Sequence, residues 1–315
     1  MAKPIYSICV PNLNMGNTLE SALISVLSQV DARFEVVVID DGSNDDSVEK
    51  LEKLKDIYPN LRTKHLQRDP KRSLAETRNI SVREARGDYC LLHIDCDDIW
   101  EPYLLDYVKV FHDIEELLHE DVLLCGHQVN MGKRSFLLEH GPYKFGHMVE
   151  DRDMWYRLAL IDKFIPLDHV VFRHRMPISY KQKLKKKFLL TGTILADEIR
   201  SGNKFTFYFT NLWRDYMKHP LELRMYKVLI YPICFLRAKR LGPIAHAEEL
   251  AGWNELKQAA KEKGGTVFEI FEKRGAQYDP SRLSPAGRWI FSHKAIDKLI
   301  GELPDNLRKR ESRLS

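Results

Sequence analysis

The stretch Phe34-Glu35-Val36-Val37-Val38-Ile39-Asp40-Asp41-Gly42-Ser43 decides the fold class of this 315-residue chain. Its first six residues are mostly β-branched and apolar, which is typical of a buried parallel strand. Two carboxylates, a glycine and a serine follow at once, as in a turn that leads into a helix. Strands that end in polar residues of this kind are typical of open α/β sheets, whose ligands bind beyond the carboxyl ends of the strands.

Strand and helix patterns alternate through the first half of the chain. Tyr6–Val10 and Leu61–Leu66 read as strands on either side of the opening stretch. The spacing predicts helices over Thr18–Gln29 and Ser47–Ile57, the first of them started by a capping box at Asn17. This alternation predicts a mostly parallel, doubly wound sheet covered by helices.

A cluster of carboxylates follows a further apolar run. Tyr89–Ile94 is expected to be a strand, and Asp95-Cys96-Asp97-Asp98 comes directly after it. Carboxylates gathered at the end of a buried strand are costly unless a cation compensates them, and hard divalent cations take oxygen ligands. On this segment alone, a solvated acidic turn is the alternative. Because Pro11–Asn14 and Asp40–Ser43 also follow strands, the three segments together favour a metal site at one edge of the sheet.

The alternation loosens in the second half. Helical spacing covers Pro102–Glu120 and Val149–Ile161, and Arg134–Leu138 is expected to be a short strand. From about residue 179 the chain becomes basic, aromatic and helical in pattern. The sequence therefore predicts a first domain over 1–178 and a mainly helical region over 179–315.

Composition narrows the class of protein. With 44% hydrophobic residues and only 16 glycines, the chain can bury a substantial core. A net charge of +4 suits contact with anions but is far below that of a dedicated nucleic-acid binder, so no nucleic-acid partner is expected. Five cysteines without paired spacing indicate free thiols in a reducing compartment. Without a signal-peptide pattern or a bilayer-length apolar run, the protein is expected to be cytoplasmic, with peripheral contact to the inner membrane surface as an option.

Five short motifs occur in a fixed order along the chain. They are Cys9–Asn14, Val38–Ser43, Glu76–Asn79, Ile94–Asp98 and Glu150–Trp155. Together they closely resemble the family-two glycosyltransferases of the GT-A fold, over roughly Ile5 to His174. The resemblance implies an α/β, Rossmann-like, mostly parallel mixed sheet with helices on both faces, followed by the mainly helical C-terminal region.

The resemblance gives several of these residues a role in nucleotide binding. Asp40 is similar to the residue that reads the nucleobase, and Arg78 resembles an arginine that contacts the nucleotide, where a cation suits a diphosphate. The alternative for Arg78 is an arginine on a helix surface. The residues expected to contact the nucleotide are Pro11, Asn12, Asn14, Asp40, Asp41, Arg78 and Asp95.

Asp95 and Asp97 match the DxD pair of the family, which implies Mg²⁺ or Mn²⁺ as the cofactor. Asp97 is expected to coordinate the metal directly, with Asp95 nearer the ribose or a metal-bound water. His174 is a third expected contact to the metal or the diphosphate, as a histidine is in some relatives. Its alternative is a structural or exposed histidine.

The pair Glu150-Asp151 matches the acidic dyad that the family carries before a helix. Asp151 is similar to the general base, and Asp153 is a second choice. The alternative is that acids at this position simply complement a helix dipole.

The resemblance implies inverting, metal-dependent transfer from a UDP- or GDP-linked sugar to an acceptor hydroxyl of a glycan, a polysaccharide or a lipid-linked acceptor. A nucleotidyltransferase is an alternative, although Pro11–Thr18 lacks the glycine-rich basic loop that binds a triphosphate. A non-catalytic nucleotide-sugar-binding protein is another, and it would be expected to have lost the base or the DxD pair.

The C-terminal region mixes basic residues with apolar and aromatic ones. Lys181–Leu190 is dense in lysine, and Tyr226–Leu236 is apolar and aromatic. This mixture suits an interfacial helix on an anionic membrane. The alternative is an ordinary helical subdomain with a solvated lysine face and a buried apolar face.

Overall fold

A computed structural model describes residues 3–141, 143, 150–176, 191–192, 195–196, 199, 221–241 and 258–295 of this chain. The lysine-rich run Lys181–Leu190, for which an interfacial helix or a helical subdomain was predicted, lies outside these residues. Within the described residues, no helix is both long enough and apolar enough to cross a membrane.

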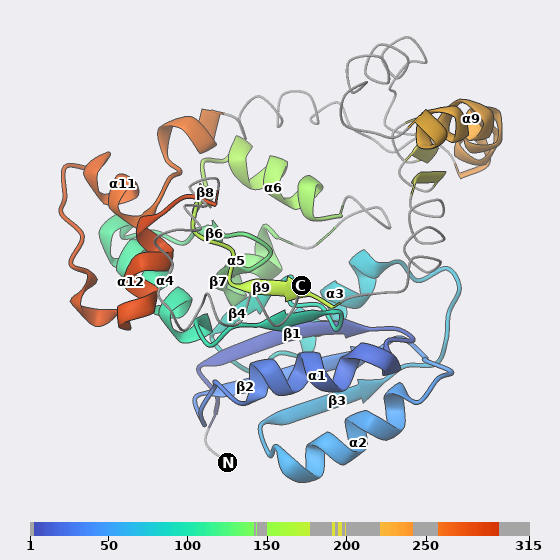
Figure 1. The fold of residues 1–315 in the computed structure, drawn as a ribbon, viewed down its shortest axis with the longest axis horizontal. Coiled ribbons are helices and arrows are strands. Elements are labelled where there is room, and N and C mark those ends of the chain that lie inside the picture. The colour runs from blue at the N-terminus through green and yellow to red at the C-terminus, as the bar shows by residue number, and fades with distance from the viewer. Residues whose placement is uncertain are drawn as a thin grey trace.

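A mixed seven-stranded sheet forms the centre of the fold (Figure 1). Its order is β3-β2-β1-β4-β7-β6-β8, and β7 alone runs against its neighbours β4 and β6. The other strands therefore all end at one edge of the sheet, and the expected mostly parallel mixed sheet is confirmed. The strands are β1 (Tyr6–Asn12), β2 (Phe34–Asp40), β3 (Leu61–His65), β4 (Tyr89–Leu92), β6 (Leu123–Cys125), β7 (Asn130–Lys133) and β8 (Phe164–Pro166).

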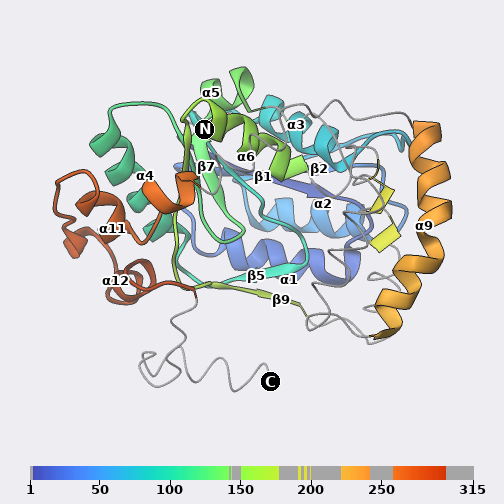
Figure 2. The same cartoon turned by 90° about the horizontal axis from the view of Figure 1, so that it is seen from above.

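Helices cover both faces of the sheet, as expected (Figure 2). Side chains alternate across a strand, so Ile8 and Val10 of β1 enter one hydrophobic core while Cys9 enters another. The first core includes α1, α2 and α4, and the second includes α3, α5 and α6. The bounds of these helices are α1 (Gly16–Leu27), α2 (Ser47–Ile57), α3 (Leu74–Glu84), α4 (Leu104–Leu118), α5 (Arg134–Glu139) and α6 (Glu150–Leu160).

The start of α1 differs from the sequence-based prediction. Asn17 lies inside the helix, and the residue before the helix, Met15, makes no side-chain capping bond, so the predicted capping box is wrong. The carboxylate of Asp45 instead accepts a hydrogen bond from the Gly16 amide at 2.8 Å. The loop after β2 thus caps the helix after β1, and the two loops are held together at the carboxyl edge of the sheet.

The segment Arg134–Leu138 was predicted to be a strand and is helical, as part of α5. Phe136 and Leu137 are both buried although they are consecutive. A strand covered on one face would bury only every second side chain, whereas a short helix lying on β7 can bury two neighbours. The predicted helix over Val149–Ile161 is confirmed as α6.

The described parts of the C-terminal region are mainly helical, as expected. It contains α9 (Leu221–Leu241), α11 (Val267–Glu272), the 3₁₀ turn η2 (Pro280–Arg282) and α12 (Pro285–Ser292). Ile270 of α11 and Phe291 of α12 join the first core, in which α4 also takes part. The described segment 258–295 therefore packs against the sheet domain, and the predicted boundary at residue 178 remains a prediction.

Candidate active site

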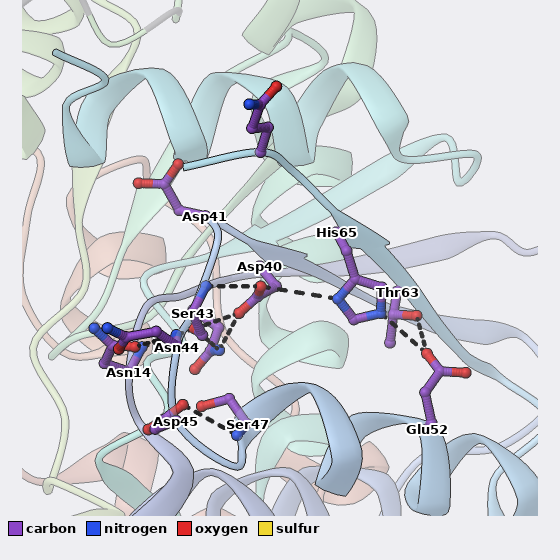
Figure 3. Close-up of polar contacts among 12 residues, drawn as sticks. Asn14, Asp40, Asp41, Ser43, Asn44, Asp45, Ser47, Glu52, Thr63 and His65 are labelled. Carbon is purple, nitrogen blue, oxygen red and sulfur yellow. Dashed lines mark hydrogen bonds and ion pairs between the residues drawn. The ribbon is translucent and has the colours of Figure 1, made fainter. Parts of the chain in front are cut away.

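Asp40, the last residue of β2, lies at the centre of a small network of hydrogen bonds (Figure 3). Asn12, the last residue of β1, lies directly opposite Asp40 on the neighbouring strand. The side-chain amide of Asn12 donates a hydrogen bond to the Asp40 carboxylate at 2.7 Å. The Ser43 amide donates to the other carboxylate oxygen at 3.1 Å. Asp40 is only 1% exposed, so these donors fix its orientation at the edge of the sheet.

Asn14 ties the loop after β1 to the loop after β2. Its φ of 53° lies in the left-handed region, which asparagine tolerates better than most residues. Its side-chain oxygen accepts from the Asn44 amide at 2.9 Å, and its own amide donates to the Ser43 hydroxyl at 2.8 Å. The predicted nucleotide contacts Pro11, Asn12, Asn14 and Asp40 are thus brought together.

Asp41 turns away from Asp40 (Figure 3). Its carboxylate is paired with Arg68 at 2.8 Å and also with Arg72, so it anchors the segment after β3. Gly42, directly after Asp41 in the loop after β2, has a φ of 77°, and a Cβ there would lie 2.5 Å from the backbone nitrogen of Arg68. Two arginines already pair with the Asp41 carboxylate. The predicted contact of Asp41 with the nucleotide remains a prediction.

The carboxylates of Asp95, Asp97 and Asp98 converge after β4. One oxygen from each lies within 4.8 Å of the others. This all-oxygen set fits Mg²⁺ or Mn²⁺. Cys96 does not fit as a ligand, because burial raises the pKa of its thiol and its Sγ lies 3.8 Å from the Pro11 carbonyl oxygen.

Asp98 is the most enclosed of the three acids. It belongs to β5 (Asp98–Trp100), which pairs with β9 (Arg173–Arg175) in a separate two-stranded sheet. Burial raises the pKa of the Asp98 carboxyl, while Arg173, at 2.6 Å, acts in the opposite direction. Asp98 Oδ2 is buried and has no hydrogen-bond partner among the described residues. An oxygen of this kind is available to a cation.

His174 lies on β9 opposite Ile99. Its Nε2 is 3.2 Å from a carboxylate oxygen of Glu101. The described residues that group around a candidate metal position are the three aspartates, without His174. Its role as a metal or diphosphate ligand remains a prediction.

Arg78 connects the acid cluster to the dyad at the start of α6. Its guanidinium donates to Asp95 at 3.0 Å and to Glu150 at 3.3 Å. Arg78 is 6% exposed, so the alternative of a helix-surface arginine is wrong. Burial alone would lower the pKa of Arg78, and the Asp95 and Glu150 carboxylates reverse that effect and raise it. Burial also raises the pKa of Glu150, against the attraction of Arg78.

Asp151 faces a neutral histidine that the sequence did not single out. His93 Nδ1 lies 3.7 Å from Asp151 Oδ2, and His93 Nε2 lies 3.0 Å from the hydroxyl of Tyr143. Burial, assisted by the charge of Arg78, lowers the pKa of His93 to about 3, so the imidazole is uncharged at neutral pH. Asn79 holds Tyr143 by two bonds to its backbone, of 2.7 and 2.8 Å.

The signal for His93 was its position. It is a polar residue inside an apolar run, two residues before the acid cluster. In the structure its φ of 67° lies in the left-handed region, which is uncommon for residues other than glycine. Nothing in the local sequence marked Tyr143, since its contacts reach back to α3 and to the end of β4 across more than 45 residues.

A cavity of about 580 Å³ opens at the same edge of the sheet, beyond β6 and β8. Trp155, which lines it, is four residues after Asp151 on α6, and residues at this spacing share one face of a helix. On another wall, His127 Nε2 lies 2.8 Å from Asp168 Oδ1. The C-terminal segment supplies the remaining charged wall, including Lys261 and Lys273.

Comparison with known proteins places part of the chain in a family. Residues 7–138 match the family described as Glycosyl transferase family 2. This segment is a family 2 glycosyltransferase domain. The glycosyltransferase domain contains Asp40, Arg78 and the acid cluster, whereas Asp151 and the cavity residues lie beyond the matched segment.

Several curated proteins are similar to parts of this chain. A chondroitin synthase of Pasteurella multocida is 31% identical over 127 residues, which are 40% of this chain and 12% of that protein. A PGL/p-HBAD biosynthesis glycosyltransferase of Mycobacterium bovis is 30% identical over 129 residues, 39% of this chain and 49% of its own. An uncharacterized glycosyltransferase of Nostoc is 26% identical over 183 residues, 53% and 55% of the two chains. The chain thus spans between about an eighth and about half of the length of these relatives.

Among solved structures, a mannosyltransferase of Pyrobaculum calidifontis in complex with GDP-Man and Mn²⁺ is 15% identical, with a TM-score of 0.47. The similarity covers 83% of this chain and 87% of that one.

Proposed function

We propose that the chain is an inverting, metal-dependent glycosyltransferase that transfers a sugar from a nucleoside-diphosphate sugar to an acceptor hydroxyl. The observation that carries the proposal is the position of Arg78. Its buried guanidinium contacts Asp95 on one side and Glu150, next to Asp151, on the other. Arg78 thereby connects two groups of acids. Asp95 belongs to the cluster suited to hold a leaving diphosphate through a metal, and Glu150 precedes Asp151, the acid suited to accept a proton from an incoming hydroxyl.

On the donor side, the nucleoside is expected to lie against Asp40 and Asn12. The Asp40 carboxylate can accept a hydrogen bond from the N–H of a uracil or guanine base, which supports a UDP- or GDP-linked donor. Asp97 and Asp95 would hold Mg²⁺ or Mn²⁺, which when bound neutralises charge on the departing diphosphate. The charge of Arg78 favours the same anion.

On the acceptor side, Asp151 removes the proton of the acceptor hydroxyl as that oxygen bonds to the anomeric carbon. The bond from the anomeric carbon to the diphosphate oxygen breaks at the opposite face, so the configuration inverts. Asp151 Oδ2 lies 3.7 Å from Nδ1 of His93, whose imidazole is uncharged at neutral pH.

The cavity beyond β6 and β8 suits the acceptor. Trp155 offers an aromatic surface to a sugar ring, and His127 and Asp168 offer polar groups to its hydroxyls. We therefore propose a glycan, polysaccharide or lipid-linked glycan as the acceptor.

The donor site is tested by thermal unfolding with UDP, GDP and their sugars, each with Mg²⁺, Mn²⁺ or chelator. One nucleotide at a hundredfold excess over its Kd is expected to stabilise the protein by about 2.7 kcal/mol in the presence of metal. Asp97→Asn should lose the metal-dependent part of this gain, while Asp56→Asn on the exposed surface of α2 should keep it. If no nucleotide stabilises the protein with either metal, the proposed function fails.

The acceptor cavity is tested by His127→Ala. Loss of a polar contact to a bound acceptor is expected to raise the acceptor KM about tenfold, with metal-dependent hydrolysis of the donor unchanged. His140→Ala is a matched control, because the His140 side chain is 39% exposed and that of His127 is 40%. Equal acceptor KM values for the two variants would exclude the cavity as the acceptor site.

A further inference from the structure

Helix α9 has two opposite apolar faces. Ile230, Cys234 and Ala238 repeat at the spacing of one helical turn, and Cys234 and Ala238 are buried. Cys234 packs with Leu195 and Ala196 in a small core of its own, and Ile230 packs against that core. Cys234 Sγ also lies 3.4 Å from the Gly192 carbonyl oxygen. This face is therefore occupied by the protein itself.

The opposite face of α9 is apolar and open. Leu229, Ile233 and Leu236 follow one another at intervals of four and three residues and are 70, 68 and 67% exposed. Met225 and Val228 extend the same stripe by one turn. We call these five residues the apolar stripe. Single exposed apolar side chains are ordinary, but a continuous row along a helix marks a surface that contacts something.

The charges of α9 indicate what that partner is. Over its whole length α9 carries five basic residues and one acidic residue, Glu222, in its first turn. Near its end, Arg237, Lys239 and Arg240 are exposed, and the Lys239 ammonium lies 5.1 Å from the centre of the Phe235 ring. A second copy of this helix would bring like charges together, whereas an anionic surface would complement them.

We propose that the apolar stripe docks onto the surface of an anionic phospholipid bilayer, with α9 lying in the plane of the interface. The leucine and isoleucine side chains enter the boundary between headgroups and acyl chains, and the basic end of the helix meets the lipid phosphates. α9 stands at the periphery of the molecule, at the opposite end from α11 and α12 (Figures 1 and 2). This position lets the helix reach a flat surface while the sheet domain remains in solvent.

Flotation of the full chain with vesicles tests the proposal. Wild-type protein is expected to float with vesicles of phosphatidylcholine and phosphatidylglycerol, and to bind vesicles of phosphatidylcholine alone at least about a hundredfold more weakly. The triple variant Leu229→Gln/Ile233→Gln/Leu236→Gln should bind the anionic vesicles at least about tenfold more weakly. Arg237→Gln/Lys239→Gln/Arg240→Gln should lose about a hundredfold on anionic vesicles and little on neutral ones.

Ile57→Gln on α2 is the matched control, since Ile57 is 67% exposed but lies on a helix that carries acidic residues. It should float like the wild type, and far-UV circular dichroism should show that all variants are folded. The proposal would be overturned if the Leu229→Gln/Ile233→Gln/Leu236→Gln variant floated at the wild-type level. It would also be overturned if the wild-type protein stayed in the soluble fraction. If the wild-type protein did not bind vesicles but sedimented as a dimer, and the Leu229→Gln/Ile233→Gln/Leu236→Gln variant sedimented as a monomer, the apolar stripe would be assigned to contact with a second copy instead.

The binding measurement uses no nucleotide and no acceptor. A protein that turns over nucleotide sugar but ignores vesicles would therefore contradict this inference alone, and the converse result would contradict only the proposed function.

Discussion

The Asp151→Asn protein is expected to lose sugar transfer by a factor of about 10²–10⁴ and to keep its affinity for the nucleotide sugar. An amide has nearly the shape of the carboxylate but cannot accept the acceptor proton. The donor contacts should survive, because the substitution leaves the ion pairs of Arg78 with Asp95 and Glu150 in place. Initial rates of transfer at saturating donor, with donor affinity measured separately by calorimetry, check both parts.

Asp153→Asn is the control on the same helix. Asp153 is the second choice for the base, yet its carboxylate is paired with Arg157 at 3.0 Å, one turn further along α6. Its loss should lower stability slightly and leave the rate within a few-fold of wild type. If Asp153→Asn abolishes transfer and Asp151→Asn does not, the role of base passes to Asp153.

The Arg78→Met protein is expected to be less stable than wild type by about 3–5 kcal/mol, since breaking a buried ion pair leaves a charge without compensation. Two carboxylates, those of Asp95 and Glu150, lose their shared cation, and Glu150 is 4% exposed. Urea unfolding followed by circular dichroism measures the loss. Arg83→Met, on the exposed side of α3, should change stability by less than about 1 kcal/mol.

The loss should depend on pH in a defined direction. Burial raises the folded-state pKa of Glu150 above its unfolded value, and removal of Arg78 should raise it further. A carboxyl whose pKa is raised on folding is tolerated when protonated and costs stability as the pH rises from its unfolded pKa through its folded pKa. The deficit of Arg78→Met should therefore be larger at pH 7 than at acidic pH, and Glu150→Gln added to it should recover part of the stability. A deficit independent of pH and of Glu150 would contradict this account.

The regular half of the fold could be predicted because its signals are local. The run Phe34–Ile39 forms most of β2, and α2 has the bounds that its spacing predicted. The ends of β1, β2 and β4 carry the polar residues that the sequence singled out, and topology alone brings them to one edge.

What could not be predicted depends on contacts between distant segments. α1 is capped by Asp45, from the next loop, because that loop happens to lie beside it. Asp41 has the same local signal as Asp40, but two arginines of a later segment draw it to the other side. The pairing of Arg78 with Glu150 joins residues 72 positions apart, and only the folded sheet places them together.

The C-terminal segment that packs on α4 has a consequence for the order of events on the ribosome. Asp106 of α4 accepts hydrogen bonds from the Ser284 amide at 3.0 Å and from its hydroxyl, and Tyr278 donates to Asp113 at 3.1 Å. These partners are synthesised more than 160 residues after the helix that they cover. While the chain emerges from the ribosome, one face of α4 therefore stays uncovered. The sheet domain cannot reach its final packing until nearly the whole described chain has been translated. During that interval the nascent protein presents an apolar surface that chaperones are suited to shield.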